Sequence, residues 1–169
     1  PGGPTGARPR SGGRGKLLHG LAGKGVDKGI KDANNMGAAM APAAADSIYR
    51  FLEDTGTAPK DYDGIFTGDL GYVGSTLLLD MLRDNGMELS GVHNDCGLML
   101  FDRQRQDVHA GGSGCGCSAS VLCGHLLNRM ERGELKNILF CATGALMSTT
   151  SQQQGEAIPG VCHIVHLGI

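Results

Sequence analysis

Apolar residues between positions 39 and 54 recur three, four and seven positions apart, which predicts a helix that covers a core with one face. The recurring positions are Ala45, Ile48, Tyr49 and Leu52. Pro42 suits the first turn of this helix, because its missing N–H would have no partner there. Gly56 suits the C-terminal cap, where the backbone often turns left-handed.

Two further stretches have helical spacing. In the first, Ser75 is the predicted N-cap, Asn85-Gly86 is the stop, and the apolar positions are Leu78, Met81 and Leu82. The second runs from residue 113 to Gly133 and is the longest helix, and its apolar positions are Ala119, Leu122, Cys123, Leu126, Leu127 and Met130. We therefore expect Cys123 on the buried face, and we expect His125 to be exposed.

Short apolar runs bounded by turn residues predict strands between these helices. They cover residues 17–26, 63–67, 97–101, 136–143 and 160–167. Residues 106–109 are a candidate partner for the strand at 97–101, and the strand at 160–167 is a candidate edge strand. The order, βαβα followed by βαββ, predicts an α/β fold with a layered sheet.

Glycine makes up 29 of the 169 residues, more than twice its roughly 7% share in average proteins. The chain has no Gly-X-Y repeat, so a collagen is excluded, and the excess is expected where the backbone turns or approaches a ligand. A net charge of −2 and a pI of about 6.3 offer no basic field, so nucleic acid is not an expected partner. The apolar runs are far shorter than the roughly 20 residues that span a bilayer.

Residues 1–16 combine glycines and prolines with four basic residues and no acid, which predicts a disordered basic tail. Residues 17–169 are then one domain. No secretory signal is visible near the N-terminus, and the six cysteines are expected to be reduced thiols. These features predict a soluble protein in a cytosol-like compartment.

The glycine-rich run 110–118 (AGGSGCGCS) leads into the longest predicted helix. Glycines let the backbone approach a ligand, and the free N–H groups at a helix start attract anions. Gly112, Ser113 and Gly114 are therefore candidate ligands of a carboxylate or phosphate. The alternative is that small residues let this helix pack tightly under a strand.

Cysteine and histidine residues lie in and near this run, but their spacing does not favour a metal site. Cys115 and Cys117 would lie about 200° apart on a helix, whereas metal ligands have to converge. We expect no metal site and no cofactor.

Polar residues gather at two predicted strand boundaries. His93, Asn94 and Asp95 precede one strand and are followed by Cys96, which leaves three interpretations: a Cys-His catalytic dyad, a turn bonded to the local backbone, or the lining of a ligand pocket or subunit interface.

Thr143 and Gly144 lie at the carboxyl end of the penultimate strand, where α/β sheets bind ligands. The alternative there is an exposed connecting loop. We take these two residues, together with His93, Asn94 and Asp95, as ligand-binding candidates.

Six segments, read in order, closely resemble the stage V sporulation protein AD family of spore-forming bacteria, within the thiolase-like, condensing-enzyme superfamily. The segments are NNMGAAMAPAAAD (34–46), DYDGIFTGDLGYVGS (61–75), HNDCGLML (93–100), AGGSGCGCSA (110–119), ATGALMS (142–148) and QQGEAIP (153–159). The resemblance covers about residues 17–167.

The resemblance implies that this chain is the C-terminal half of a two-half protein. Each half of such a protein is a βαβαβαββ unit, with a five-stranded mixed sheet covered by helices. The half that carries the superfamily's nucleophilic cysteine is then missing, so none of the six cysteines here inherits that role and no catalytic residue is assigned. Residues 68–71 (GDLG) and 109–112 (HAGG) also differ from the acid/base motifs of condensing enzymes.

The resemblance further implies a non-catalytic protein that binds dipicolinic acid (pyridine-2,6-dicarboxylate) and assists its uptake into the developing spore. The implied partners are the N-terminal half, membrane transport proteins of the spore and a second copy in a homodimer, and the implied location is cytoplasmic or peripheral to the spore membrane. The alternative is an acyltransferase or thiolase-type enzyme acting on acyl thioesters through His93, Cys96, His109 and Cys141. A purely structural subunit is a third interpretation.

Overall fold

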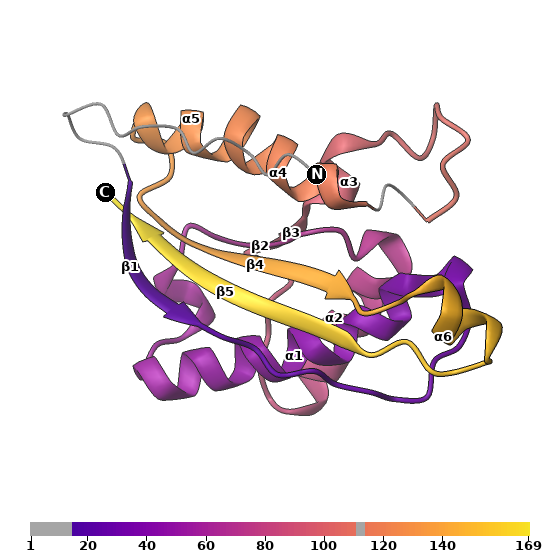
Figure 1. Ribbon diagram of the computed structural model, residues 1–169. Coiled ribbons are helices and arrows are strands. Elements are labelled where there is room, and N and C mark those ends of the chain that lie inside the picture. The colour runs from indigo at the N-terminus through magenta and orange to yellow at the C-terminus, as the bar shows by residue number, and fades with distance from the viewer. Residues whose placement is uncertain (1–14, 111–113) are drawn as a thin grey trace.

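A five-stranded mixed sheet forms the centre of the computed structural model, which describes residues 15–110 and 114–169 (Figure 1). The strands are β1 (Lys16–Leu21), β2 (Gly64–Thr67), β3 (His93–Asp95), β4 (Asn137–Ala145) and β5 (Gly160–Gly168), in the order β1-β5-β4-β2-β3. β2 is parallel to both β3 and β4, whereas β5 is antiparallel to β4 and β1. The predicted α/β class with a mixed sheet is confirmed.

Helices cover both faces of the sheet (Figure 1). One face carries α1 (Met36–Thr55) and α2 (Gly71–Asp84), and the other carries α3 (Cys96–Leu100), α4 (Cys115–Val121) and α5 (Leu127–Glu131). A π-helical turn, Leu122–Leu126, joins α4 to α5, and a short α6 (Thr149–Gln153) follows β4. None of the helices in the described ranges is long and apolar enough to cross a bilayer.

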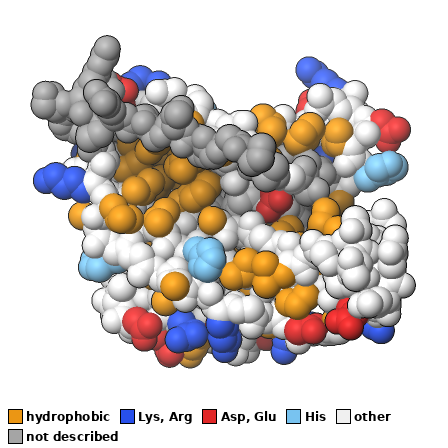
Figure 2. All heavy atoms as spheres, viewed as in Figure 1, with side chains coloured by type: hydrophobic (Ala, Val, Ile, Leu, Met, Phe, Trp, Pro, Cys, Tyr) orange, Lys and Arg blue, Asp and Glu red, His pale blue; other side chains and the backbone are white. Residues whose placement is uncertain are grey.

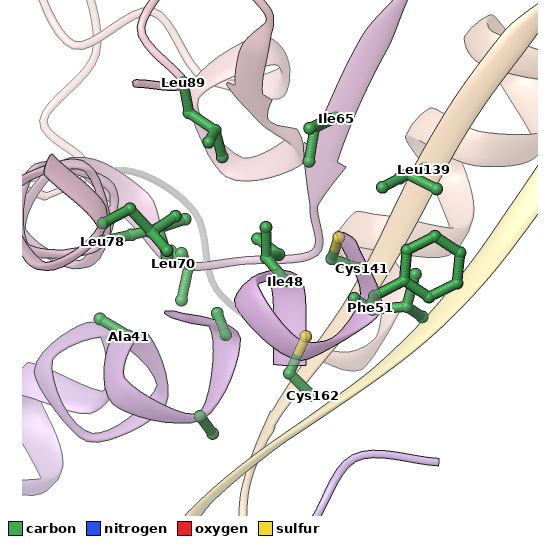
Figure 3. Packing of buried hydrophobic residues seen from close by; sticks show 14 of the residues in the cluster. Ala41, Ile48, Phe51, Ile65, Leu70, Leu78, Leu89, Leu139, Cys141 and Cys162 are labelled. Carbon is green, nitrogen blue, oxygen red and sulfur yellow. The ribbon is translucent and has the colours of Figure 1, made fainter. Parts of the chain in front are cut away.

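Alternate residues of β4 supply the two hydrophobic clusters, one on each face of the sheet. Leu139 packs in the α1 cluster with Ile48 and Ile65, as Figure 3 shows. Ile138 and Phe140 pack in the other cluster, with apolar residues of the α4–α5 segment. A strand that is buried on both faces reads as a continuous apolar run, which explains why its sequence predicted it well.

Two predicted helix starts were wrong. Pro42 is the seventh residue of α1 rather than a first-turn residue, because Asn35 caps the helix seven positions earlier. α2 begins at Gly71, so Ser75 lies buried inside it and does not cap it. The predicted stops are confirmed, since Gly56 is left-handed at the C-cap of α1 and Gly86 is left-handed just after α2.

Three predictions about strands and burial were also wrong. Residues 97–101 belong mostly to α3, because Asp95 caps a helix there, and residues 106–109 are irregular rather than a strand. β5 lies between β1 and β4 and is therefore not an edge strand; the edge strands are β1 and β3. Cys123 is exposed rather than buried, whereas His125 is exposed as expected.

Candidate functional site

The carboxyl ends of β2, β3 and β4 meet at one edge of the sheet, because the three strands are parallel. Thr67 ends β2 and pairs with Asp95 on one side and with Cys141 of β4 on the other. Side chains that follow these strand ends therefore converge, as expected for the ligand-binding edge of an α/β sheet.

Asp95 is fully buried at this edge and organises three segments. Its Oδ1 accepts hydrogen bonds from Thr67 Oγ1 (2.7 Å) and from the Leu70 N–H (2.8 Å). Its Oδ2 accepts from the N–H groups of Gly71 (3.0 Å), Gly97 (3.0 Å) and Leu98 (3.4 Å). One carboxylate thus ties the end of β2 and the start of α2 to the start of α3.

Burial raises the pKa of Asp95, while the hydrogen bonds that it accepts act in the opposite direction. A buried carboxylate is costly unless its lone pairs are satisfied, and here five donors satisfy them. This arrangement is typical of a structural carboxylate that positions backbone, rather than one that reaches a substrate.

His93 is connected to the same carboxylate through Thr67. Its Nε2 lies 3.0 Å from Thr67 Oγ1. The single hydroxyl proton of Thr67 goes to Asp95, so Nε2 carries a proton and donates it to the Thr67 oxygen. Burial lowers the pKa of His93 to about 4, so the imidazole is neutral near pH 7.

Asp69 forms a second carboxylate contact, beside the first. Its Oδ1 accepts from Thr143 Oγ1 (2.8 Å), and its Oδ2 accepts from the N–H of Gly114 (3.0 Å), just before α4. The backbone N–H of Asp69 donates back to Thr143 Oγ1 (3.1 Å). The amide at the glycine-rich run and the hydroxyl of β4 therefore hold a carboxylate, and that carboxylate belongs to the chain itself.

Gly68 allows this close arrangement between β2 and β4. A Cβ built on Gly68 would lie 2.8 Å from Thr143 Oγ1 and 3.3 Å from Ser118 Cβ. Both distances are shorter than ordinary van der Waals contacts, so a side chain at position 68 would push Thr143 and Asp69 apart.

Thiols surround the two carboxylates but are not activated by them. Burial, together with the nearby charges of Asp95 and Asp69, raises the pKa of Cys96 to about 12 and also raises the pKa of Cys117. A hydrogen bond to Cys162 together with burial raises the pKa of Cys141. Since the thiolate is the nucleophile, these cysteines are the reverse of activated nucleophiles.

The structure brings together most of the residues that the sequence singled out. His93, Asp95, Thr143 and Gly114 lie at the edge, while Asn94 is exposed and its Oδ1 accepts from the next backbone N–H, that of Asp95 (2.9 Å). Gly144 follows Thr143 within β4. Gly112 and Ser113 lie outside the described residues, and the ligand-binding role of all these positions remains a prediction.

Sequence reasoning missed Thr67 and Asp69 as members of the site. The available signal was the string FTGD, in which a strand ends on a hydroxyl and runs into a glycine turn with an acid. Within the described ranges, no three His, Cys, Asp or Glu side chains converge as a metal site would require.

The sheet has the strand order β1-β5-β4-β2-β3, only β5 runs against its neighbours, and helices cover both faces. This arrangement is the fold of one half of a thiolase-like α/β protein. The sequence matches the Stage V sporulation protein AD (SpoVAD) family over residues 10–168. It is also 46% identical over 148 residues to Stage V sporulation protein AD of Bacillus subtilis (strain 168). The chain therefore belongs to the stage V sporulation protein AD family.

The alignment with the Bacillus subtilis protein covers 88% of this chain but 44% of that relative. The chain thus spans less than half the length of the relative that it matches, as the resemblance to a single thiolase-like half implied.

Proposed function

We propose that this protein acts in spore formation as a non-catalytic binding protein for dipicolinate and assists its uptake into the developing spore. The observation that carries the proposal is the carboxylate held by the Gly114 amide and the Thr143 hydroxyl. A carboxylate group of dipicolinate would take the place of the Asp69 side chain on these two donors. Asp69 is half-buried, so its side chain has solvent into which it can turn.

The state of the thiols supports a binding role over acyl transfer. Covalent catalysis by cysteine needs a thiolate next to a base, and the pKa values of Cys96, Cys117 and Cys141 are all raised. The His93 Nε2 proton points to Thr67 rather than to a thiol.

We propose that the α4–α5 segment packs against the N-terminal half of a full-length protein. Ala119, Cys123 and Leu127 are exposed and lie four positions apart, on the face that does not cover the sheet. Such spacing forms one stripe on a helix, and small residues in the stripe permit close helix packing. We also propose two further partners. One is a second copy of the protein in a homodimer, and the other is the membrane transport proteins of the spore, since the protein would act at the spore membrane.

Isothermal titration with dipicolinate tests the proposed binding, on this chain and on a full-length form in which the chain replaces the matching segment of the Bacillus subtilis relative. We expect Asp69→Ala to tighten binding severalfold, because the variant removes both the competing carboxylate and its repulsion of a dianion. Thr143→Val is expected to weaken binding about tenfold. Asp107→Ala is the control, since it removes the same charge from a nearly fully exposed position. If neither protein shows a heat of binding at millimolar dipicolinate, the proposal is wrong.

A further inference from the structure

The segment between α3 and α4 is fastened to the start of α2. The Tyr72 N–H donates to the Ala110 carbonyl (2.6 Å), and a Cβ on Gly71 would lie only 2.7 Å from that same oxygen. Gly71 has a φ of 64°, a conformation that glycine adopts without strain. Residues 101–110 are therefore held against the edge of the sheet that carries Asp69.

Arg103 is the positioned cation of this segment. Its guanidinium carbon lies 4.0 Å from the centroid of the Tyr72 ring, and its Nε donates to the His109 carbonyl (2.9 Å). Stacking and one hydrogen bond fix the plane of the guanidinium. Among the described residues, the structure gives no partner to its two Nη groups, which leaves one complete edge of the guanidinium available.

The other ionisable side chains of the segment are arranged differently. Arg105 lies 3.6 Å from Asp102 and is 87% exposed, and His109 lies 3.9 Å from Asp107. Figure 2 shows basic, acidic and histidine side chains together on the lobe at the upper right, where Figure 1 draws this segment. Of the two arginines in the segment, Arg103 is held by an aromatic ring and a carbonyl group, whereas Arg105 is held by a carboxylate.

His109 provides a second sign that the segment has a specific shape. Its φ is 48°, the only positive value of a non-glycine residue in the described ranges. This conformation costs about 1–2 kcal/mol for an L-residue. The strained residue supplies the carbonyl that orients Arg103, and strain of this kind is often retained at ligand-binding positions.

An open cavity of about 520 Å³ lies directly beside Arg103. Its lining is the continuous stretch from Leu98 to Gln104, with Met99, Leu100 and Phe101 as the apolar wall. The volume falls within the roughly 300–1,000 Å³ of small-molecule sites, and the cavity is wide open to solvent, so a ligand there would keep part of its surface exposed. An apolar wall next to one oriented guanidinium matches a ligand with a flat ring and a carboxylate.

We infer that Arg103, oriented by Tyr72 and the His109 carbonyl, is a docking point for the carboxylate of a planar aromatic acid. The two free Nη groups would each donate one hydrogen bond to the two carboxylate oxygens, and the ring would lie on the apolar wall. The inference rests on the proposed function, because Tyr72 follows Asp69 by three residues and its N–H holds Ala110, four residues before Gly114.

Calorimetric titration of four Arg103 and Tyr72 variants in the full-length form tests the inference. The ligands are dipicolinate, picolinate, benzoate and the non-aromatic dicarboxylate glutarate. Arg103→Gln is expected to weaken binding of the aromatic acids at least tenfold, and Arg103→Lys nearly as much, because lysine lacks the planar fork. Tyr72→Leu is expected to weaken binding severalfold, whereas Tyr72→Phe retains the stacking platform and is expected to match the wild type.

Arg105→Gln is the matched control, because it removes the same charge from the same segment. An unchanged affinity in Arg103→Gln, or equal losses in Arg103→Gln and Arg105→Gln, would overturn the inference while leaving the proposed function standing. Arg103-dependent binding of benzoate or picolinate without dipicolinate binding would overturn the proposed function and support the inference. No binding of any aromatic acid by the wild type would overturn both.

Discussion

The hydroxyl of Thr67 donates a 2.7 Å hydrogen bond to the carboxylate of Asp95 across two neighbouring parallel strands. Through this bond the end of β2 becomes part of a network that also holds the first residues of α2 and α3. The neighbouring Asp69 carboxylate, bonded to Thr143 and Gly114, connects the same turn to β4 and α4. Two acids therefore set the geometry of the whole sheet edge.

Asp95→Ala is expected to destabilise the fold by at least about 3 kcal/mol, because five buried donors lose their acceptor. The measurement is the free energy of unfolding in urea. Asp84→Ala, at an exposed position near the end of α2, is the control and is expected to change stability by less than about 0.5 kcal/mol. Equal effects of the two substitutions would contradict the structural role given to Asp95.

His93 is expected to make stability depend on pH. Its pKa is about 4 in the folded protein against 6.5 when unperturbed, so the unfolded chain binds the proton more readily. The contribution is present above pH 6.5 and is lost as the pH falls toward 4. Between pH 7.5 and pH 5.0, the wild type should lose about 2 kcal/mol more stability than His93→Gln.

Urea unfolding at the two pH values, with the exposed His125→Gln as a control, measures this difference. Parallel pH profiles of the wild type and His93→Gln would show that His93 is not the group responsible.

Thiol labelling should separate the cysteines by burial. Cys123 is exposed and is expected to react with iodoacetamide at pH 8 at least tenfold faster than Cys96 or Cys141, which are fully buried and have raised pKa values. Peptide mass spectrometry after timed labelling gives the individual rates. Rapid modification of Cys96, or an acyl adduct on it after incubation with acyl-CoA, would instead favour the enzyme alternative.

Gly68→Ala is expected to disturb the site directly, since the new Cβ would lie 2.8 Å from Thr143 Oγ1. We expect a loss of about 1–3 kcal/mol in unfolding free energy and a weaker affinity for dipicolinate. Gly25→Ala is the matched control, because a Cβ there meets nothing within 4 Å. Equal stability and equal affinity of the two variants would show that position 68 is not closely packed against Thr143.

Hydrophobic pattern predicted the fold wherever a segment was long or buried on both faces. α1, the α4–α5 segment and β5 were predicted because a side that packs against the core leaves a regular period in the sequence. β4 was predicted because burial on both faces leaves a continuous apolar run. α3 was mistaken for a strand because five residues are too few to show a period, and its start depends on the Asp95 side chain. Cys123 has helical spacing, but the helix carries a second apolar stripe on its exposed face.

The site was predicted only in part. Thr143 was found at a predicted strand end and Gly114 in a glycine-rich run. His93 and Asp95 were singled out as polar residues before a predicted strand, whereas they form the strand β3 themselves and a helix follows. Asp69 could not be assigned from the sequence, because its contact with Gly114 joins residues 45 positions apart and depends on how β2, β4 and α4 pack. Local pattern predicted an anion site but did not show that a carboxylate of the chain occupies it.

The central claim is that dipicolinate binds at the sheet edge that carries Asp69. An NMR titration with dipicolinate tests it most directly, with the ¹⁵N-labelled full-length form and this chain measured in parallel. The proposed site predicts saturable shifts of the Gly114 and Asp69 amides, with tighter binding in Asp69→Ala and no shift of Gly86, which lies beyond the far end of α2. Unmoved Gly114 and Asp69 amides at millimolar dipicolinate in both proteins would contradict the claim that this edge binds the ligand.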